Sequence, residues 1–368
     1  MKKLGFGLMR LPVIDGDNNK IDYEKAREMI DKYMANGFTY FDTAYMYHGG
    51  ESEKAFGELV AKRYSRSSYI LTDKMPVMRI NSADEYPKIF AEQLQRCQVE
   101  YFDYYFLHAI GMNTYRKIQE HDGFGYLKKL KEEGKIKHIG FSFHDTADVL
   151  DKILTEHPET ELVQLQINYI DWEDDSIQAR KNYEVCMRHG VDIAIMEPLK
   201  GGSLVRLPEK AKDILFNANP NASIASWGLR FASSLDKVVI VLSGMSNMEQ
   251  LEDNMSFMSD FVPLSESERN TIDKVVDIIN ESIAVACTGC RYCVDGCPKK
   301  IAIPEYFAIY NNQSQFGLVP GLRTTYNHLK ANGGAPSDCI NCRKCVKACP
   351  QQLDIPLHLA GVTKTFEG

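Results

Sequence analysis

The chain has 368 residues and a formal net charge of −7, and 44% of its residues are hydrophobic and 25% charged. These values are typical of a globular protein with one large domain or two to three smaller ones, and they exclude disorder and collagen-like repeats. No apolar run approaches the length of about 18 residues that a membrane span needs, and the first residues lack the apolar segment of a secretion signal. We therefore expect a cytoplasmic protein without a membrane partner.

Over the first 280 residues, short β-rich runs alternate with longer helical patterns, several of which stop at a glycine such as Gly37, Gly134 or Gly190. Eight strands between helices predict an α/β fold, a (β/α)8 TIM barrel. A doubly wound sheet gives the same alternation, but no strand here is followed by a G-x-G-x-x-G turn. The expected strands are 38–41, 69–72, 104–107, 138–141, 162–167, 192–196, 238–242 and 257–262, and the expected helices include 23–36, 52–63, 86–98, 122–133 and 264–279.

Cysteine and charge are distributed unevenly. Eight of the ten cysteines lie after residue 286, and the other two, Cys97 and Cys186, are single. Residues 287–368 hold nine Lys and Arg against five Asp and Glu, a balance of +4, whereas the preceding residues hold 34 against 45. We therefore predict two domains, 1–282 and 283–368. A balance of +4 is too small to indicate a nucleic-acid partner.

The eight late cysteines form two runs with one spacing, C-x2-C-x2-C-x3-C followed by proline. A disulfide framework would suit a short secreted chain, which this is not. Zinc sites usually pair C-x2-C with a second pair about a dozen residues away, and they do not place three cysteines in a row. The spacing is instead typical of [4Fe–4S] ligation. The runs are Cys287, Cys290, Cys293 and Cys297, then Cys339, Cys342, Cys345 and Cys349.

This segment resembles a bacterial-type two-cluster ferredoxin domain, which implies an α+β ferredoxin-like iron–sulfur fold. The 41 residues between the runs exceed those of a minimal ferredoxin, and residues 311–336 are rich in Asn, Gly and Pro and are expected to form loops. In such ferredoxins the fourth cysteine of each run binds the other cluster. The resemblance thus implies one [4Fe–4S] cluster on Cys287, Cys290, Cys293 and Cys349, and a second on Cys339, Cys342, Cys345 and Cys297.

Four polar residues fall at or just beyond the ends of expected strands, where barrel enzymes place their catalytic groups. Asp42, Lys74 and His108 each follow one of the first three strands, and Tyr47 lies in the loop after Asp42. A phenol with a pKa of about 10 is a weak acid at pH 7, and a neighbouring ammonium from Lys74 should lower that pKa. Asp42 should keep Lys74 charged, and His108 can hydrogen-bond a carbonyl oxygen. The four residues together predict a proton donor for carbonyl reduction.

The same part of the chain resembles the aldo-keto reductase superfamily, in order and in spacing, from about residue 4 to about residue 280. The resemblance implies that Asp42, Tyr47, Lys74 and His108 form a catalytic tetrad in which Tyr47 is the general acid for reduction. The matching segments are FDTAYMYHGGESEKAFGELV, LTDKM, DYYFLHA, IGFSFHD, LVQLQINY, MEPLKGGSL, ASWGLRFASS and VLSGMSNMEQLEDNM.

The resemblance also implies a nicotinamide cofactor, NAD(H) or NADP(H). Ser142 and Gln164 match residues that hydrogen-bond the nicotinamide carboxamide. Phe143 stands where the family usually has Asn, so one amide contact is missing or replaced. Met196 stands where many members have a tyrosine that stacks on the nicotinamide ring, and its sulfur can pack on an aromatic face. The alternative interpretation of Met196 is a buried strand residue.

The segment after the seventh expected strand, residues 243–254, matches the part that holds the adenosine end of the cofactor. Members that prefer NADP carry a Lys near position 244 and an Arg near position 250, and both cations are absent here. Their loss should weaken selection for the 2′-phosphate, so we expect NAD(H) to be accepted. The candidate residues on this side are Ser243, Gly244, Ser246, Gln250 and Asn254.

Three functions are compatible with these features. The first is a nicotinamide-dependent oxidoreductase that reduces an aldehyde or ketone to an alcohol, or the reverse, with clusters for electron transfer or structure. The second is an electron-transfer protein that couples a barrel-bound substrate or cofactor to a ferredoxin or flavoprotein partner, although no flavin motif is present to split a hydride. The third is a catalytically silent redox sensor, against which the complete tetrad argues. Because exposed clusters survive best at low oxygen, we expect the cytoplasm of an anaerobic or microaerobic prokaryote.

Overall fold

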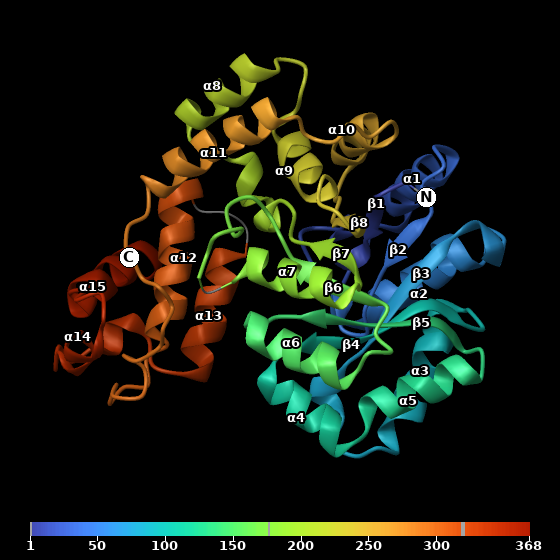
Figure 1. Cartoon of the computed structure of the whole chain (residues 1–368), viewed down its shortest axis with the longest axis horizontal. Helices are drawn as coiled ribbons and strands as arrows, with labels where there is room; N and C mark the ends of the chain where they lie inside the picture. The colour runs from blue at the N-terminus through green and yellow to red at the C-terminus, as the bar shows by residue number, and fades with distance from the viewer. Residues whose placement is uncertain (1, 176, 318–320) are drawn as a thin grey trace. The chain divides into compact units, whose positions relative to one another are not determined.

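Eight parallel strands close into a barrel in sequential order, β1 pairing with β8 (Figure 1). The computed structural model of the protein describes residues 2–175, 177–317 and 321–368. The predicted (β/α)8 barrel is confirmed. Its strands are β1 (Leu4–Gly7), β2 (Tyr40–Asp42), β3 (Ile70–Met75), β4 (Phe102–Ile110), β5 (Ile136–Phe143), β6 (Leu162–Gln166), β7 (Asp192–Met196) and β8 (Val238–Ser243).

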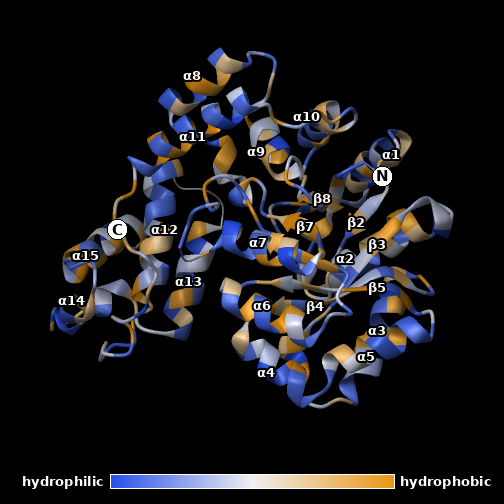
Figure 2. Ribbon diagram, in the orientation of Figure 1, coloured by the Kyte–Doolittle hydropathy of each residue, from blue (hydrophilic) through white to orange (hydrophobic). Residues whose placement is uncertain are grey.

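Helices follow the strands and carry both hydrophobic and hydrophilic residues, as α3 and α5 show in Figure 2. Polar side chains cap the first turns of two of them: Asp22 caps α1, and Ser265 and Glu268 form a reciprocal capping box on α11. None of the described helices is long and apolar enough to cross a membrane. The helices up to residue 280 are α1 (Tyr23–Ala35), α2 (Glu51–Phe56), α3 (Glu85–Cys97), α4 (Met112–Glu120), α5 (Gly123–Glu132), α6 (Ala147–Glu156), α7 (Ala179–His189), α8 (Glu209–Ala218), α9 (Ile224–Ser233), α10 (Met248–Met258) and α11 (Glu266–Asn280).

One of the eight expected strands was wrong. Residues 257–262 form the end of α10 and the connection after it, and the strand that completes the barrel is β1 at the N-terminus. Two of the four residues of β1 are glycines, which are depleted in strands, so the sequence pattern hid it. The side chains of neighbouring strands pack closely on Gly5, since a Cβ there would lie 2.7 Å from Leu242 Cδ2 and would force this methyl group to shift.

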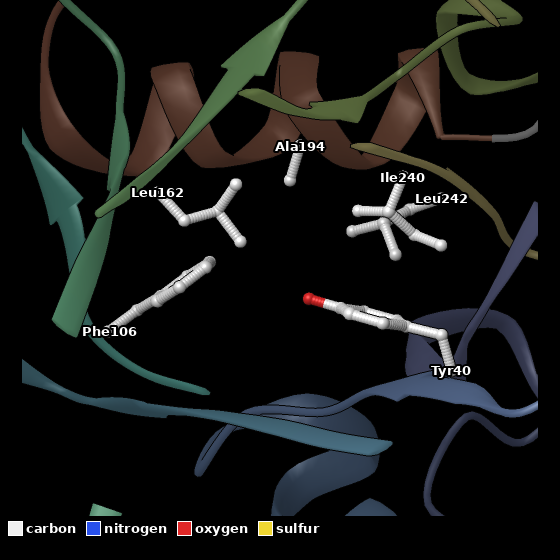
Figure 3. Packing of buried hydrophobic residues seen from close by; sticks show 6 residues of the cluster. All are labelled: Tyr40, Phe106, Leu162, Ala194, Ile240 and Leu242. Carbon is white, nitrogen blue, oxygen red and sulfur yellow. The ribbon is translucent and has the colours of Figure 1, made fainter. Parts of the chain in front are cut away.

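The barrel interior is filled by side chains that point toward one another from different strands (Figure 3). Tyr40, Phe106, Leu162 and Ile240 come from β2, β4, β6 and β8, which is the layered packing of alternate strands typical of TIM barrels. This layer forms an apolar floor. Side chains two positions further along the same strands also point into the barrel. They lie one layer nearer to the carboxyl ends of the strands.

After residue 283 the described residues form helices, namely α12 (Ile303–Phe316), α13 (Leu322–Asn332), α14 (Lys344–Ala348) and α15 (Ile355–Phe366). The expectation of loops over 311–336 was wrong, because most of this stretch lies in α12 and α13. Its Asn residues lie on α12 and α13, and Asn311 bonds the backbone of Val285 through both ends of its amide. The β part of the expected α+β fold is, within the described residues, a single bridge between Ile301 and Gly334.

The chain packs as two compact units. One holds the barrel strands and comprises residues up to 173, 177–198 and 225–264, and the other is formed mainly by 199–224 and 265–368. Helices α8 and α11 therefore pack together within the second unit. The predicted domains, 1–282 and 283–368, are segments expected to fold independently. How the chain packs does not test this, so the boundary stays a prediction.

Candidate functional site

The predicted site residues lie one layer above the apolar floor. Asp42 follows the floor residue Tyr40 by two positions, and His108 follows Phe106 in the same way. Side chains alternate along a strand, so this spacing directs both pairs to the interior of the barrel. The same spacing holds for Ser142 after Gly140, Gln164 after Leu162 and Met196 after Ala194.

Lys74 is the centre of the predicted tetrad. Its Nζ lies 2.6 Å from Asp42 Oδ1, 2.8 Å from the backbone oxygen of Thr43 and 3.5 Å from the Tyr47 hydroxyl. The Lys74 side chain is fully buried, so this ion pair is shielded from solvent. The structure thus brings Asp42, Lys74 and Tyr47 together as the sequence predicted.

The charges of this group follow from burial and from their mutual contacts. Burial alone would lower the pKa of Lys74, but Asp42 and Tyr47 more than offset this, and the pKa is raised. Burial raises the pKa of Asp42, against the opposing effect of Lys74. Burial also raises the pKa of Tyr47, and Lys74 acts against that rise. The expected lowering of the Tyr47 pKa was therefore wrong in its net direction, although Lys74 acts in the expected sense.

His108 completes the group from β4. Its ring meets the Tyr47 ring edge-on, with centroids 6.1 Å apart. Burial, then the charges of Lys74 and His144, lower the pKa of His108 to about 3, so the imidazole is neutral at physiological pH. Its Nδ1 is buried and has no hydrogen-bond partner within the described part of the chain. A neutral imidazole carries one N–H, which can donate a hydrogen bond to a substrate oxygen.

The residues expected at the nicotinamide ring line the next strands. Ser142 Oγ accepts a hydrogen bond of 2.8 Å from the backbone N–H of Ala109, which leaves its own proton to donate. Gln164 Oε1 is buried, and no described residue supplies it with a hydrogen-bond partner. Buried polar atoms are normally paired, so an orphaned amide oxygen at the carboxyl end of β6 fits a ligand with an N–H group. The Met196 side chain, at the end of β7, is partly exposed.

The adenosine-side candidates follow β8, which was counted as the seventh strand because β1 was missed. Ser243 ends β8, and Asn254 on α10 donates a 3.0 Å hydrogen bond to its hydroxyl, so both side chains are buried and bonded to each other. Ser246 and Gln250 are joined by a 2.8 Å bond from the Ser246 N–H to the Gln250 amide oxygen. Gly244 lies against Arg10 of the chain's N-terminal segment, whose Cδ would be 2.8 Å from a Cβ at this position.

Sequence reasoning missed a buried polar cluster directly behind Lys74. Asp73 accepts the backbone N–H of Lys74 at 2.7 Å, and Gln93 on α3 donates to the Lys74 carbonyl at 3.1 Å and to Glu53 at 2.9 Å. Cys97 contacts the other Asp73 oxygen at 3.6 Å. Burial, then the Glu53 carboxyl, raise the pKa of Asp73 well above its usual range, and burial raises that of Glu53. Two charged residues in succession within the otherwise apolar strand β3 were the available signal.

The two cysteine runs come together around two cavities. One cavity is lined by the first three cysteines of the first run and the last of the second: Cys287, Cys290, Cys293 and Cys349. The other is lined by Cys297, Cys339, Cys342 and Cys345. These are the two crossed sets that the ferredoxin resemblance implied. Ile303 at the start of α12 lines both cavities.

The cysteines surround space and do not converge on one point. Nowhere in residues 2–175, 177–317 and 321–368 do three His, Cys, Asp or Glu side chains lie close enough to hold a single metal ion. Four thiols spread around an apolar cavity fit a cluster of several iron and sulfur atoms better than one tetrahedral zinc ion. Cys97 and Cys186 are buried elsewhere as free thiols.

A closed barrel with a buried Lys–Asp pair and a tyrosine at the carboxyl ends of its strands has polar groups where enzymes of this fold carry their catalytic residues. Residues 3–277 match the model of the Aldo/keto reductase family, and residues 286–353 match that of a 4Fe-4S dicluster domain. The chain belongs to the aldo/keto reductase family and carries a 4Fe-4S dicluster domain after the barrel.

Relatives are similar over most of the barrel. The chain is 30% identical to "Probable aldo-keto reductase 1" of Glycine max over 245 residues, which are 64% of this chain and 66% of that protein. It is 27% identical to L-galactose dehydrogenase of Arabidopsis thaliana, over 75% of this chain and 90% of that protein. A solved aldo-keto reductase of Klebsiella pneumoniae in complex with NADPH covers 74% of this chain and 90% of its own, with 19% identity and a TM-score of 0.59. A holo aldo-keto reductase of Bacillus halodurans gives 23% identity over 74% and 91% of the two chains, with a TM-score of 0.57. At these identities the solved structures support the fold.

Proposed function

We propose that the barrel interconverts an aldehyde or ketone and the corresponding alcohol with a nicotinamide cofactor. The observation that carries this proposal is the position of Lys74 Nζ, buried between Asp42 Oδ1 and the Tyr47 hydroxyl. That arrangement supplies a phenol with a fixed cation beside it at the open end of the barrel. Carbonyl reduction needs such a proton donor, because the oxygen gains negative charge as the carbon accepts hydride.

The residues of the chain have separate roles in this reaction. Bound NAD(P)H would supply the hydride. The Tyr47 hydroxyl donates the proton to the carbonyl oxygen in reduction and takes it back in oxidation. The Lys74 ammonium stabilises the phenolate that remains, and Asp42 keeps Lys74 charged. Neutral His108 orients the carbonyl oxygen with a hydrogen bond. The high Tyr47 pKa keeps the phenol protonated until the oxygen gains charge.

The nicotinamide cofactor fits the residues at the ends of β5 to β8. Gln164 and Ser142 would bind the carboxamide, because Gln164 offers an orphaned buried oxygen and Ser142 retains a free proton. Met196 would pack on the nicotinamide ring. The segment from Ser243 to Asn254, with Gly244, Ser246 and Gln250, would hold the adenosine end. The Klebsiella relative was solved with NADPH, but this chain lacks cations at positions 244 and 250, so we propose that it accepts NADH as well.

We also propose that residues 283–368 hold two [4Fe–4S] clusters, one in each cysteine-lined cavity, and fold separately from a barrel comprising residues 1–282. The crossed lining sets support this, since each cavity takes three cysteines from one run and one from the other. The clusters supply one-electron chemistry or brace the helices. The alternative function, electron transfer between a barrel-bound cofactor and a ferredoxin or flavoprotein, is favoured by the same domain.

An anaerobic assay distinguishes these functions. Reconstituted protein is mixed with NADH or NADPH, with and without a panel of aldehydes, ketones and alcohols. Our proposal expects NADH oxidation only when a carbonyl compound is added, with the cluster absorbance unchanged. Bleaching of the clusters by NADH alone would support the electron-transfer alternative. Absence of turnover and of nicotinamide binding with every compound would leave the redox-sensor function.

A further inference from the structure

The cysteine runs are part of a longer internal repeat. Residues 287–307 and 339–359 align without a gap at an offset of 52 residues, from the first cysteine of each run into the helix that follows the run. Both halves place an arginine with positive φ after the second cysteine, Arg291 at 65° and Arg343 at 56°. Both then begin a helix with Ile-Pro, at Ile303 in α12 and Ile355 in α15. The two halves therefore build equivalent surroundings for the two cavities.

At two equivalent positions, the second half has an exposed aliphatic side chain where the first half has a polar one. Ile340 and Leu357 of the second half are 58% and 67% exposed. Their counterparts in the first half are Thr288 and Glu305, and Glu305 pairs with Arg291. Among the hydrophobic side chains of the first run, that of Tyr292 is exposed. Ile340 lines the second cavity and Leu357 lines the groove beside it, so both are available for apolar contact with a partner protein.

The two cysteine runs also differ in charge. Residues 339–349 carry three cations and no anion, whereas residues 287–297 carry one cation and one anion. Lys344 and Lys347 are exposed, and their counterparts in the first half are Tyr292 and Asp295. The exposed Lys299 and Lys300 follow the first run, and Lys299 lines the second cavity together with Lys344 and Arg343, which pairs with Asp354. The lining of the first cavity includes Arg291, which pairs with Glu305. The cations of both halves are therefore concentrated at the second cavity.

The distinguishing residues lie beside the second cavity. Ile340, Arg343 and Lys344 line that cavity together with its cysteines. Leu357 lines an adjoining groove that also includes Arg343 and Cys339. We call Ile340, Arg343, Lys344, Lys347 and Leu357 the second-cavity face.

We propose that the second-cavity face is the docking site of an acidic one-electron carrier protein that exchanges electrons with the cluster in this cavity. This inference rests on the proposed clusters. The exposed lysines would steer an acidic carrier, and Ile340 and Leu357 would supply the apolar contact at the centre of the interface. The carrier loses one electron and the cluster gains one, or the reverse, and no bond or proton changes. The internal repeat explains why this cavity serves as the port. The lining of the other cavity includes one cation, Arg291, which pairs with Glu305, and the counterparts of Ile340 and Leu357 in that half are Thr288 and Glu305.

The test uses the full reconstituted chain and a small acidic plant-type [2Fe–2S] ferredoxin as probe. Anaerobic stopped-flow spectroscopy measures electron transfer from the pre-reduced ferredoxin at several salt concentrations, and isothermal titration calorimetry measures binding of the oxidised ferredoxin. The test variant is Lys344→Glu/Lys347→Glu. The matched control, Lys274→Glu/Lys364→Glu, makes the same change in net charge at exposed positions on α11 and at the far end of α15.

We expect the test variant to slow electron transfer at low salt by about 10-fold or more, with the difference shrinking as salt rises, and to weaken binding. The control should stay within about twofold of the parent, because long-range charge at distant exposed sites is screened. Ile340→Thr and Leu357→Glu, which install the residues of the first half, should weaken binding at all salt concentrations.

Equal rates for the test and control variants would overturn the proposal, as would faster electron exchange with a basic carrier such as cytochrome c than with the ferredoxin. Iron content and NADH-dependent carbonyl reduction are measured on every variant. Retained carbonyl reduction with no docking effect overturns only the docking proposal. A chain that takes up no iron on reconstitution overturns the cluster proposal, and the docking proposal with it.

Discussion

Lys74 and Asp42 form a buried ion pair across β3 and β2, with 2.6 Å between Nζ and Oδ1 and no exposure of the Lys74 side chain. Asp42 is the last residue of β2, so its carboxylate lies beside the interior face of β3. The pair fixes the ammonium at 3.5 Å from the Tyr47 hydroxyl. In the proposed reaction, the proton chemistry of Tyr47 therefore depends on two residues from strands β2 and β3.

Tyr47→Phe removes the proposed proton donor and keeps the ring that packs near His108. We expect kcat/KM for carbonyl reduction to fall by about 10²- to 10⁴-fold, with the affinity for the nicotinamide cofactor little changed. Steady-state kinetics and fluorescence titration with NADH measure the two quantities. Tyr45→Phe is the matched control, because the Tyr45 hydroxyl bonds Glu92 and lies in the same loop. Similar losses in both variants would argue against a specific role for Tyr47.

Lys74→Met leaves the Asp42 carboxylate buried without its partner. We expect the free energy of unfolding at pH 8 to fall by about 3–5 kcal/mol, because an uncompensated charge remains in the interior. The loss should be smaller at pH 5, since Asp42 in this variant can take up a proton as the pH falls. Urea unfolding of the parent and of Lys74→Met at pH 8 and pH 5 measures this loss of free energy of unfolding. The double variant Asp42→Asn/Lys74→Met should recover part of the stability, and a double variant less stable than Lys74→Met would contradict this account.

Asp73 and Glu53 make folding stability depend on pH. Their raised pKa values mean that the folded chain binds more protons than the unfolded chain above the ordinary carboxyl range of about 4. Their contribution to stability is therefore complete at low pH and is lost as the pH rises through the raised pKa values. Asp73→Asn keeps an oxygen for the Lys74 N–H and removes one titrating group. We expect its free energy of unfolding to fall less than that of the parent between pH 5 and pH 8.

The control for this measurement is Asp84→Asn. Asp84 is fully exposed, and its hydrogen bonds with Lys88 and Ser82 lower its pKa to about 2, so its contribution changes only in more acidic solution. Its stability profile between pH 5 and pH 8 should follow that of the parent. Identical profiles for Asp73→Asn and Asp84→Asn would show that the buried acid cluster does not titrate in this range.

The crossed cavities predict which cysteine variants affect the same cluster. Cys290→Ala and Cys349→Ala should each remove the signal of one cluster, and the double variant should retain the other cluster, since both thiols line one cavity. Cys290→Ala/Cys297→Ala should damage both clusters, because Cys297 lines the second cavity. Spin counting by electron paramagnetic resonance and iron analysis measure the outcome. The control Cys186→Ala should retain both clusters. Loss of both clusters in Cys290→Ala/Cys349→Ala would contradict the crossed assignment.

Much of the fold could be predicted because its signals are local. Seven of the eight strands carry apolar β-rich runs, and the spacing of the cysteines is a covalent property of the chain. The strand β1 was not predicted, because the glycines at positions 5 and 7 lack the side chains on which strand patterns depend. The helices over 311–336, in α12 and α13, were not predicted, because their Asn residues suggested loops. Asn311 instead bonds the backbone of Val285, 26 residues away.

By itself the sequence determined the barrel class, the identity of the tetrad candidates and the two cysteine runs, because residue type and spacing are written along the chain. Only the tertiary structure decided that burial outweighs Lys74 in setting the direction of the Tyr47 pKa, and that Asp73 and Glu53 meet behind Lys74. It also showed that the two runs exchange their last cysteines between two cavities. These features depend on desolvation and on contacts between residues distant in sequence, and neither is encoded in local pattern.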